Sequence, residues 1–516
     1  MAVNRGIVSS DGVVRSSSRD VEIPDQDFPT FIWSRAIEYA DRPALTCGLT
    51  KRNYTFSEAR SLSRRFGASL LDKGLNPGDV LAIMLPNAID YPIVLLGALE
   101  AGLLVTTIDP AFKKNELSLQ VRTTNAKVIV TIPTVVPLVK AVLEELGVTM
   151  PIILVNLRGQ ETGHDIWSYR DLISKSDGSD TQRQWPQISP DDIAILLSSS
   201  GTTGNDQHSL LMAASLSHLS GQLLVWSGLI NGANNFILPV CEPEPLINAL
   251  TEQKPLSVTC FLYPVMFSEL NALIKTDDLE PLRLILTGCS SFIPAHVNAF
   301  LAKLPNREEA SFYSVFGLTE VLPLFMALQN DQNPLNLGYP EPNTELKVID
   351  ARGKSLGPGE VGELCVRGPQ VMKGYFNNEK ATQDTFDGDW FKTGDTVYYD
   401  EDGMFHLAGR SKDLIKVGGR SVSPSELEFV LLSHPKITDA GVVGVPDDTV
   451  GEKPVAFVVP KPSVEIDPRE IQAFVSSELA PYKALSRVIV TDSLPRNSIG
   501  KMLKRVLKES LCSKGL

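Results

Sequence analysis

Residues 196–204, which read Leu-Leu-Ser-Ser-Ser-Gly-Thr-Thr-Gly, are the first stretch of the chain whose residue types could do chemistry. Backbone N–H groups of a glycine-rich loop and the hydroxyls of Ser and Thr can together hold phosphate oxygens. The candidate phosphate-binding residues are Ser199, Ser200, Gly201, Thr202, Thr203 and Gly204. A run of this composition alone is more often an ordinary loop, so the interpretation needs support from elsewhere in the chain.

Four further motifs follow in order along the chain. They are Phe-Gly-Leu-Thr-Glu at residues 316–320, Thr-Gly-Asp at 393–395, Gly-Arg-Ser-Lys-Asp at 409–413 and Ser-Ile-Gly-Lys at 498–501. With the glycine-rich run they resemble the adenylate-forming superfamily, in particular acyl-CoA synthetases and 4-coumarate-CoA ligases. The resemblance runs from about residue 31 to residue 507 and includes connecting sequence such as Trp-Phe-Lys-Thr-Gly-Asp at 390–395.

The resemblance implies a two-step reaction that uses ATP, Mg²⁺ and CoA. A carboxylate attacks the α-phosphate of ATP to give an acyl-adenylate and pyrophosphate, and the thiol of CoA then displaces AMP. Such transfer depends mainly on positioning and on neutralising the negative charge that develops. The expected function is an ATP-dependent carboxylate-CoA ligase, an acid-thiol ligase whose partners are small molecules.

The resemblance also assigns roles to single residues. The candidate adenine and ribose residues are Ser314, Val315, Phe316, Gly317, Asp395 and Arg410. Asp395 would accept both ribose hydroxyls, and Phe316 would stack on adenine. Thr319 and Glu320 would face the α-phosphate and Mg²⁺, respectively. Each also has an ordinary alternative, because Asp395 could cap a turn, Phe316 could fill the core and Glu320 could be a solvated charge.

The C-terminal motifs would supply the mobile parts of the site. By resemblance, Lys501 bridges the carboxylate substrate and the α-phosphate, acting as a movable point charge. Its ordinary alternative is the start of a solvated basic helix face. Lys412 corresponds to a hinge, and Gly418 and Gly419 to the loop that binds CoA after the domain rotates. Lys416 lies in the strand before that loop, and the Lys-Val-Gly-Gly pattern looks closer to fatty-acyl-type members than to coumarate ligases.

The sequence departs from the family directly after the glycine-rich run. Relatives continue with a Pro-Lys-Gly element, a Thr-His pair and a helix, whereas Gly204 is followed by Asn-Asp-Gln-His at residues 205–208. The absent lysine normally helps to hold the β- and γ-phosphates, and losing one such contact costs about 1.5–3 kcal/mol. Two hypotheses follow: an active ligase, or a catalytically impaired homologue that keeps the fold for binding or regulation.

The pocket for the acyl group is expected to include His218, Gly288 and Ser290. Leu-Ser-His at residues 216–218 stands where relatives carry a Phe-His segment. A lone histidine between leucines is as often a satisfied core residue, so His218 keeps both interpretations.

Alternating helix and strand patterns must position these motifs, which predicts an α/β fold. Thr-Phe-Ser-Glu at residues 55–58 is a capping box that predicts a helix start. Apolar runs at 79–86, 127–131, 152–155, 193–197 and 284–286 predict buried strands of largely parallel sheets. Caps at 423–426 and 467–470 predict two helices in a small α+β C-terminal domain.

These patterns divide the chain. We expect a flexible arm over residues 1–25, a large N-terminal domain over 26–411 that includes a β-rich subdomain at 345–411, and a C-terminal lid domain over 412–516 with its hinge near Lys412.

Composition excludes several classes of function. The net charge of −13 argues against a sequence-independent nucleic-acid binder, which needs clustered Lys and Arg. Six scattered cysteines indicate neither a disulfide framework nor a zinc site. The most apolar window, residues 91–107, is interrupted by Glu100 and Gly102 and is too short to span a bilayer, so it predicts a buried helix that runs into a strand. We expect a cytoplasmic protein, with the peroxisome as the alternative because the terminal Ser-Lys-Gly-Leu resembles the Ser-Lys-Leu address.

Overall fold

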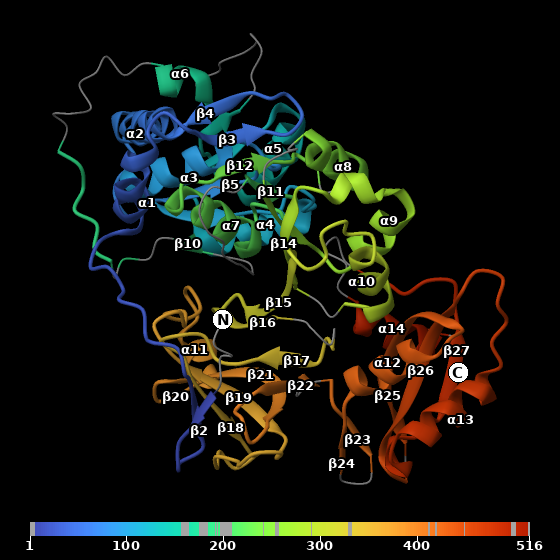
Figure 1. Ribbon diagram of the computed structural model, residues 1–516. Coiled ribbons are helices and arrows are strands. Elements are labelled where there is room, and N and C mark those ends of the chain that lie inside the picture. Colours follow the sequence, from blue (N-terminus) through green and yellow to red (C-terminus); the bar gives the residue numbers. More distant parts are fainter. Residues whose placement is uncertain are drawn as a thin grey trace.

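Four β-sheets organise the part of the chain that the structure describes. This computed structural model describes residues 6–155, 165–174, 184–190, 192, 195–196, 209–240, 242–252, 257–289, 292–328, 333–410, 413–417, 420–447, 449–496 and 502–513. Two sheets are mainly parallel and two are mainly antiparallel. The fold is therefore mixed α/β, as the alternating sequence patterns predicted (Figure 1).

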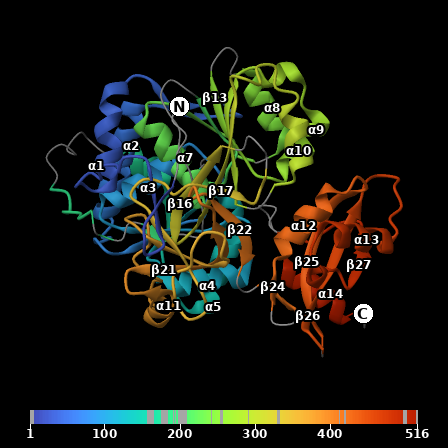
Figure 2. The same cartoon turned by 60° about the horizontal axis from the view of Figure 1, so that its bottom comes forward.

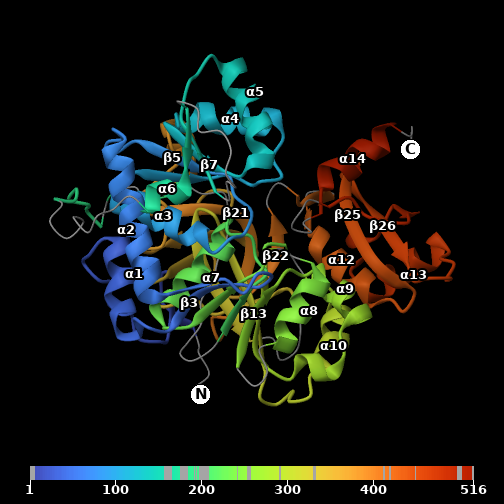
Figure 3. The same ribbon diagram turned by 90° about the horizontal axis from the view of Figure 1, so that it is seen from above.

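The first parallel sheet is covered by helices on both faces. In spatial order its strands are β10 (Ile195–Leu196), β6 (Leu104–Thr107), β5 (Val80–Ile83), β7 (Val128–Thr131), β8 (Ile152–Leu154) and β9 (Ile166–Ser168). Its helices are α2 (Phe56–Asp72), α3 (Asp90–Glu100), α4 (Lys114–Thr124), α5 (Val136–Leu146) and α6 (Tyr169–Ser174). In β5, Leu81 packs in the main core with α2 and α3, whereas Ala82 packs in a second cluster with α4 and α5 (Figure 3). Because both faces are buried, β5 is apolar at every position, which made it recognisable in the sequence.

The second sheet carries the strands that lead into the candidate site. In spatial order they are β16 (Val321–Leu328), β15 (Ser311–Leu318), β14 (Leu282–Gly288), β13 (Val258–Leu262), β11 (Ser209–Met212), β12 (Asn234–Ile237), β3 (Pro43–Cys47) and β4 (Asn53–Thr55). The helices that accompany it are α1 (Phe28–Ala36), α7 (Leu219–Ile230), α8 (Pro243–Glu252), α9 (Met266–Leu273) and α10 (Pro294–Leu301). The strands from β15 to β3 are parallel, and one hydrophobic core joins them to the first sheet.

The capping box at the start of α2 has the geometry that the sequence predicted. The Thr55 hydroxyl accepts a hydrogen bond from the Glu58 N–H at 3.2 Å, and the Glu58 carboxylate accepts one from the Thr55 N–H at 2.8 Å. Both groups would otherwise lack partners in the first helical turn. The helix ends at Asp72, just before Gly74, whose φ of +87° is a conformation that glycine adopts without a steric penalty.

The expected flexible N-terminal arm is wrong for residues 6–16. They form a hairpin of β1 (Gly6–Val8) and β2 (Val13–Ser16), and β2 pairs with β18 (Glu345–Ile349) at the edge of the β-rich sheet. Val14 is fully buried in the core of that sheet. The Glu345 carboxylate forms ion pairs with the guanidinium groups of Arg15 and Arg367. The pairing with β18, the burial of Val14 and the ion pairs of Glu345 hold residues 6–16 in place, although this stretch has few apolar residues.

The rest of the β-rich sheet is antiparallel. After β18 its strands are β19 (Gly362–Arg367), β21 (Trp390–Tyr399), β22 (Phe405–Arg410) and β17 (Asn336–Gly338), with the short β20 (Phe386–Asp387) on β21 and helix α11 (Glu379–Thr385) between β19 and β20 in the chain. Figure 1 shows this sheet below the two parallel sheets, with the β15–β16 hairpin between them. The sheet therefore begins earlier in the chain than the predicted subdomain.

A separate sheet forms the C-terminal lobe. It contains β24 (Arg420–Val422), β23 (Ile415–Val417), β26 (Gly451–Pro460), β25 (Ile437–Asp447) and β27 (Arg487–Val490), with helices α12 (Pro424–Ser433), α13 (Pro468–Glu478) and α14 (Lys504–Ser513). Both predicted helix starts have their cap, since Ser423 accepts from the Glu426 N–H and Asp467 accepts from the Arg469 N–H. Figures 1 and 2 show the lobe beside α10.

The most apolar window forms a buried helix followed by a strand, α3 and β6, as the sequence predicted. No helix of the described residues has the length and hydropathy that crossing a membrane requires.

The N-terminal hairpin generates a stability prediction. Val14→Ala leaves a cavity in the β-rich sheet and should lower the free energy of unfolding by about 1–3 kcal/mol. The matched control is Ile7→Ala, because the Ile7 side chain is 58% exposed on the other strand of the same hairpin. Scanning calorimetry should show a melting midpoint below that of the wild type for Val14→Ala and an unchanged midpoint for Ile7→Ala. Equal midpoints for both variants would contradict a structural role of the hairpin.

Candidate active site

Asp395 is a nearly buried acid at the end of the β-rich sheet. It lies opposite Arg410 in the pairing of β21 with β22, and the Arg410 Nε lies 2.8 Å from one carboxylate oxygen. The Asp395 side chain is 3% exposed and that of Arg410 is 48% exposed. A carboxylate this deep is stable as an anion only beside a positive charge or several hydrogen-bond donors, and Arg410 supplies the charge. The predicted ribose pair is therefore assembled.

The turn before Asp395 is held by its own polar groups. The Asp395 N–H donates to the Thr393 hydroxyl at 3.0 Å, and the Gly394 N–H donates to the Glu363 carboxylate at 3.1 Å. Gly394 has a φ of +71°, which favours glycine at this position. The Thr-Gly-Asp motif thus fixes where the acid points. Glu363 was not predicted as a site residue, although it lies in the connecting sequence that carried the family resemblance.

Three predicted residues, Gly288, Ser314 and Val315, meet where β14 ends beside the middle of β15. Thr287 pairs with Ser314, and Gly288 pairs with Val315, in parallel register. A Cβ atom at Gly288 would come within 2.6 Å of the Val315 carbonyl oxygen, so only glycine fits there. The carboxyl ends of parallel strands are where ligands bind in α/β sheets. Gly288, Ser314 and Val315 are thereby gathered at one edge.

Phe316 lies on the connection from this edge to the β-rich sheet. Its ring centroid is 5.9 Å from that of Phe325, which in turn is 5.2 Å from that of Phe405 in β22. Phe316 is only partly buried by this packing. The aromatic chain joins the strand pair β15–β16, which carries the predicted adenine residues, to the strand that ends at Arg410.

Glu320 occupies the turn between β15 and β16, next to Thr319. Its carboxylate accepts a hydrogen bond from the Tyr375 hydroxyl at 2.9 Å, and its backbone carbonyl accepts one from the Met372 N–H at 2.7 Å. Burial and the hydrogen bond to Glu320 raise the pKa of Tyr375, which keeps it a donor. The acid is therefore positioned by the β-rich unit. Tyr375 was missed as a site residue; its signal was the Lys-Gly-Tyr at residues 373–375.

The donor set around Glu320 fits a magnesium ion that arrives with ATP. Mg²⁺ prefers oxygen ligands and is commonly held by one or two carboxylates together with substrate phosphates. Within the described ranges, no group of three or more His, Cys, Asp or Glu side chains could hold a metal ion by itself.

His218 faces a carboxylate that the sequence analysis did not single out. Its Nε2 lies 3.6 Å from an Asp109 carboxylate oxygen, and both side chains are 16% exposed. The interaction with His218 lowers the pKa of Asp109. The Thr107 hydroxyl donates to the Ser217 carbonyl at 2.8 Å, which ties the end of β6 to the loop before α7. The pairing with Asp109 is compatible with both interpretations of His218, a satisfied core histidine and a residue of the acyl pocket. Asp-Pro at residues 109–110, directly after a strand, was the available signal.

Two of the remaining predicted residues are described, Gly317 in β15 and Lys416 in β23, and the others are not. Lys416 lies on β23 with an exposed side chain, and its N–H donates to the Glu452 carboxylate at 2.8 Å. Outside the described residues lie Ser199, Ser200, Gly201, Thr202, Thr203, Gly204, Ser290, Lys412, Gly418, Gly419 and Lys501.

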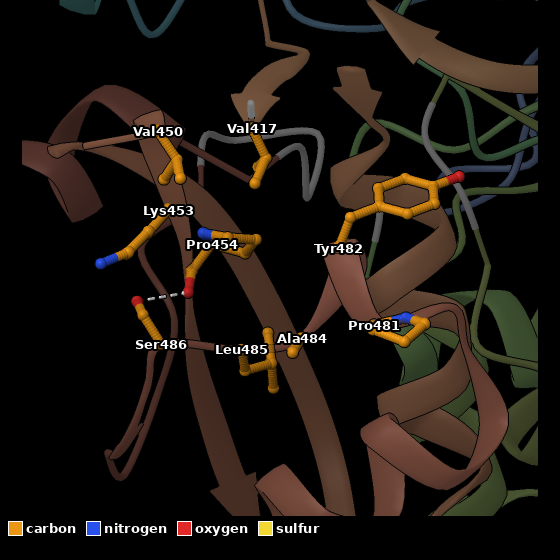
Figure 4. Close-up of a pocket in the computed structure, with 9 residues that line it drawn as sticks. All are labelled: Val417, Val450, Lys453, Pro454, Pro481, Tyr482, Ala484, Leu485 and Ser486. Atoms are coloured by element: carbon orange, nitrogen blue, oxygen red, sulfur yellow. Dashed lines mark hydrogen bonds between the residues drawn. The ribbon is translucent and has the colours of Figure 1, made fainter. Parts of the chain in front are cut away.

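A pocket of about 530 Å³ opens in the C-terminal lobe (Figure 4). Its lining consists of Val417, Val450, Lys453, Pro454, Pro481, Tyr482, Ala484, Leu485 and Ser486. Val417 is the last residue of β23, directly before the predicted CoA loop. The Ser486 hydroxyl donates to the Pro454 carbonyl at 2.7 Å, which joins the loop before β27 to β26.

Two family models match this chain. The model described as AMP-binding enzyme matches residues 32–206 and 205–376, and the model described as AMP-binding enzyme C-terminal domain matches residues 426–501.

Curated relatives match over nearly the whole chain. The 4-coumarate-CoA ligase 3 of Oryza sativa subsp. japonica is 32% identical, over 98% of this chain and 97% of its own length. The 4-coumarate-CoA ligase of Pinus taeda is 30% identical, over 99% of each protein. The peroxisomal OPC-8:0-CoA ligase 1 of Arabidopsis thaliana is 29% identical, over 94% of this chain and 93% of its own length.

Solved structures share the fold. ATP-bound MatB from Rhodopseudomonas palustris superposes with a TM-score of 0.81 at 24% identity, covering 93% of this chain and 99% of MatB. The anthranilate CoA ligase AuaEII in complex with anthranoyl-AMP gives a TM-score of 0.83 at 23% identity, covering 96% of this chain and 99% of AuaEII. Since a family model matches most of the chain and a relative is 32% identical over 98% of it, the chain belongs to the AMP-binding enzyme family.

Proposed function

We propose that the chain is an ATP-dependent carboxylate-CoA ligase. In the first step a carboxylate oxygen attacks the α-phosphorus of ATP, the bond to the β-phosphate oxygen breaks, and pyrophosphate leaves. In the second step the sulfur of CoA attacks the acyl carbon, the bond to the phosphate oxygen breaks, and AMP leaves while the thiol proton passes to solvent. The observation that carries the proposal is the nearly buried Asp395 carboxylate held by Arg410.

The nucleotide roles follow from the geometry of the β-rich sheet. The Asp395 carboxylate is paired with Arg410, and the Asp395 N–H donates to the Thr393 hydroxyl, which holds the backbone of the same residue. The anionic carboxylate would accept charge-assisted hydrogen bonds from the two ribose hydroxyls. Ser314, Val315 and Phe316 would offer backbone and an aromatic face for the base.

The phosphates would be neutralised from two directions. Glu320 is placed to hold Mg²⁺ through oxygen, and the ion would supply positive charge beside the phosphate oxygens. Lys501 would bring a second positive charge from the C-terminal lobe to the α-phosphate during adenylation. For the second step the lobe would turn about Lys412, and the glycine loop beside Lys416 would replace the lysine.

The relatives favour an enzyme over an impaired homologue. The curated relatives at 28–32% identity that cover this chain almost completely are CoA ligases by name. Fold alone does not fix activity, but here the ribose pair is assembled as well. The acid belongs to the class of aryl or fatty-acyl carboxylates that those relatives' names span, 4-coumarate and OPC-8:0.

Two observations support the proposal that a phosphate-binding segment is absent. The family-model match is broken into two parts that meet at residues 205–206, where the sequence leaves the family pattern. The alignment with the rice ligase runs over 552 positions, more than the 516 residues of this chain, so the rice ligase carries segments that this chain lacks.

We propose a cytoplasmic location. The peroxisomal Arabidopsis relative is the reason to keep the peroxisome as the alternative.

Pyrophosphate exchange tests the first step. With a panel of aryl and fatty acids, the purified protein should catalyse acid-dependent exchange of labelled pyrophosphate into ATP. Lys501→Ala should reduce that exchange by about 100-fold, because a misplaced or missing charge is lost from the transition state. No exchange with any acid, or a wild-type rate in Lys501→Ala, would overturn the proposed function.

Asp395→Asn tests the ribose site. Replacing the anion by a neutral amide should cost about 1.5–3 kcal/mol of ATP binding, which is a rise of about 10- to 150-fold in the KM for ATP. Asp389→Asn is the matched control, since Asp389 is exposed in the turn before the same strand. Steady-state kinetics with ATP varied should show the change only in the first variant.

The absent segment predicts weak ATP binding. Measured side by side with the rice 4-coumarate-CoA ligase 3, the KM for ATP of this protein should be at least about tenfold higher, because one charge-assisted phosphate contact is missing. The KM for CoA serves as the control, since CoA enters after pyrophosphate has left. Equal KM values for ATP would show that another group compensates.

A further inference from the structure

The chain on both sides of residues 497–501 is tied to the C-terminal lobe by charged side chains. On the N-terminal side, Arg496 Nη2 donates to both carboxylate oxygens of Asp439 in β25, at 2.7 and 2.9 Å. On the C-terminal side, the Lys504 ammonium lies 2.8 Å from a carboxylate oxygen of Glu428 in α12. These four side chains are between 16% and 28% exposed, so the pairs are partly shielded from water.

The two flanks are also joined to each other. Arg496 and Met502 form an antiparallel bridge, and the Leu503 N–H donates to the Pro495 carbonyl at 2.8 Å. Residues paired in this way have Cα atoms roughly 4.5–5.5 Å apart. The two flanks, which end at Arg496 and begin again at Met502, are therefore held side by side.

Met502 is fixed by close packing as well. A Cβ atom at Gly441 would come within 2.6 Å of the Met502 sulfur, so the side chain lies directly on the backbone of β25. Met502 also packs against a cluster that includes Phe457 and Leu507. Met502, the residue that follows Lys501 in the chain, is therefore fixed against β25.

The carboxylate of Glu428 ties this flank to the rest of the lobe. Besides Lys504, its partner is the Val442 N–H at 2.9 Å, in the strand on which Met502 lies. Burial raises the pKa of Glu428, and Lys504 opposes that shift. A buried acid is costly without its cation, so the pair holds α12, β25 and the start of α14 in one arrangement.

We propose that Asp439 and Glu428 are positioning residues for Lys501, which clamp the two ends of its segment and thereby serve adenylation and not thioester formation. This inference rests on the proposed function, because Lys501 takes part there only in the first step. Neither residue touches a substrate. Each acts through the flank that it holds, and a shift of about 1 Å at a reacting charge can cost 100-fold in rate.

The test separates the two half-reactions in the full-length protein. Asp439→Asn and Glu428→Gln should each lower acid-dependent pyrophosphate exchange by about 10- to 100-fold. Conversion of a purified acyl-adenylate and CoA into acyl-CoA should stay within about twofold of wild type. Lys501→Ala should show the same split with a larger loss. A parallel fall of both half-reactions, or no change in either, would overturn the proposal.

Matched controls and a coupling test sharpen the result. Glu509→Gln makes the same change in an ion pair of the same helix α14, but that pair, with Arg505, is exposed, so both half-reactions should be unchanged. Asp439→Asn should add little to the loss already caused by Arg496→Gln, because the two side chains act as one unit. Additive losses would mean that Asp439 acts through some other group.

Hydrogen exchange gives a readout that does not need activity. The Leu503 amide should exchange at least about tenfold faster in Asp439→Asn and in Glu428→Gln than in wild type or Glu509→Gln, because its hydrogen bond to Pro495 depends on the clamp. Unchanged exchange in both variants would overturn the clamp. If exchange rises as expected but Lys501→Ala retains wild-type adenylation, the proposed role of Lys501 fails instead.

Discussion

The pairing of Asp395 with Arg410 is the interaction on which the rest of the arrangement depends. A nearly buried acid requires a cation, and here that cation is the last residue of the β-rich sheet before the C-terminal lobe. The next described strand, β23, begins at Ile415 and belongs to a different sheet. Arg410, which completes the proposed ribose site, is thus also the residue from which the chain leaves for the lobe. Under the proposed function, one residue both helps to bind the sugar and sets where the lobe begins.

Local signals in the sequence predicted the helices and buried strands of the fold. The cap at Thr55 and the caps before α12 and α13 are set by neighbouring residues, and strands such as β5 are apolar because helices cover both faces. The N-terminal hairpin could not be predicted in this way. Arg15 finds its partner Glu345 330 positions later, and no pattern within residues 1–25 reports that pairing.

The candidate site shows the same contrast between residues with local signals and residues that depend on distant partners. Asp395, Arg410 and the candidate residues of β15 were predicted because each lies in a short motif. The register of one sheet then pairs Asp395 with Arg410, and that of another places β15 beside the end of β14. The groups that orient them were missed. Tyr375 reaches Glu320 from 55 positions away, and Asp109 faces His218 across two sheets, so their roles depend on tertiary contacts. Their residue types are common on protein surfaces, so their roles can be identified only from the partners that they contact in the fold.

The proposed absence of a phosphate-binding segment after Gly204 leaves other charges to neutralise the phosphates. The family resemblance implies a lysine there, whereas this chain continues with Asn-Asp-Gln-His. Of the other predicted cations, Arg410 is paired with Asp395, Lys412 is assigned to the hinge, and Lys416 lies on the strand before the predicted CoA loop. Under the proposed function, Lys501 and the magnesium ion are then the charges left for the phosphates during adenylation. A chain that relies on one lysine gains most from holding it precisely in place, which is the physical reason for charged ties on both sides of its segment.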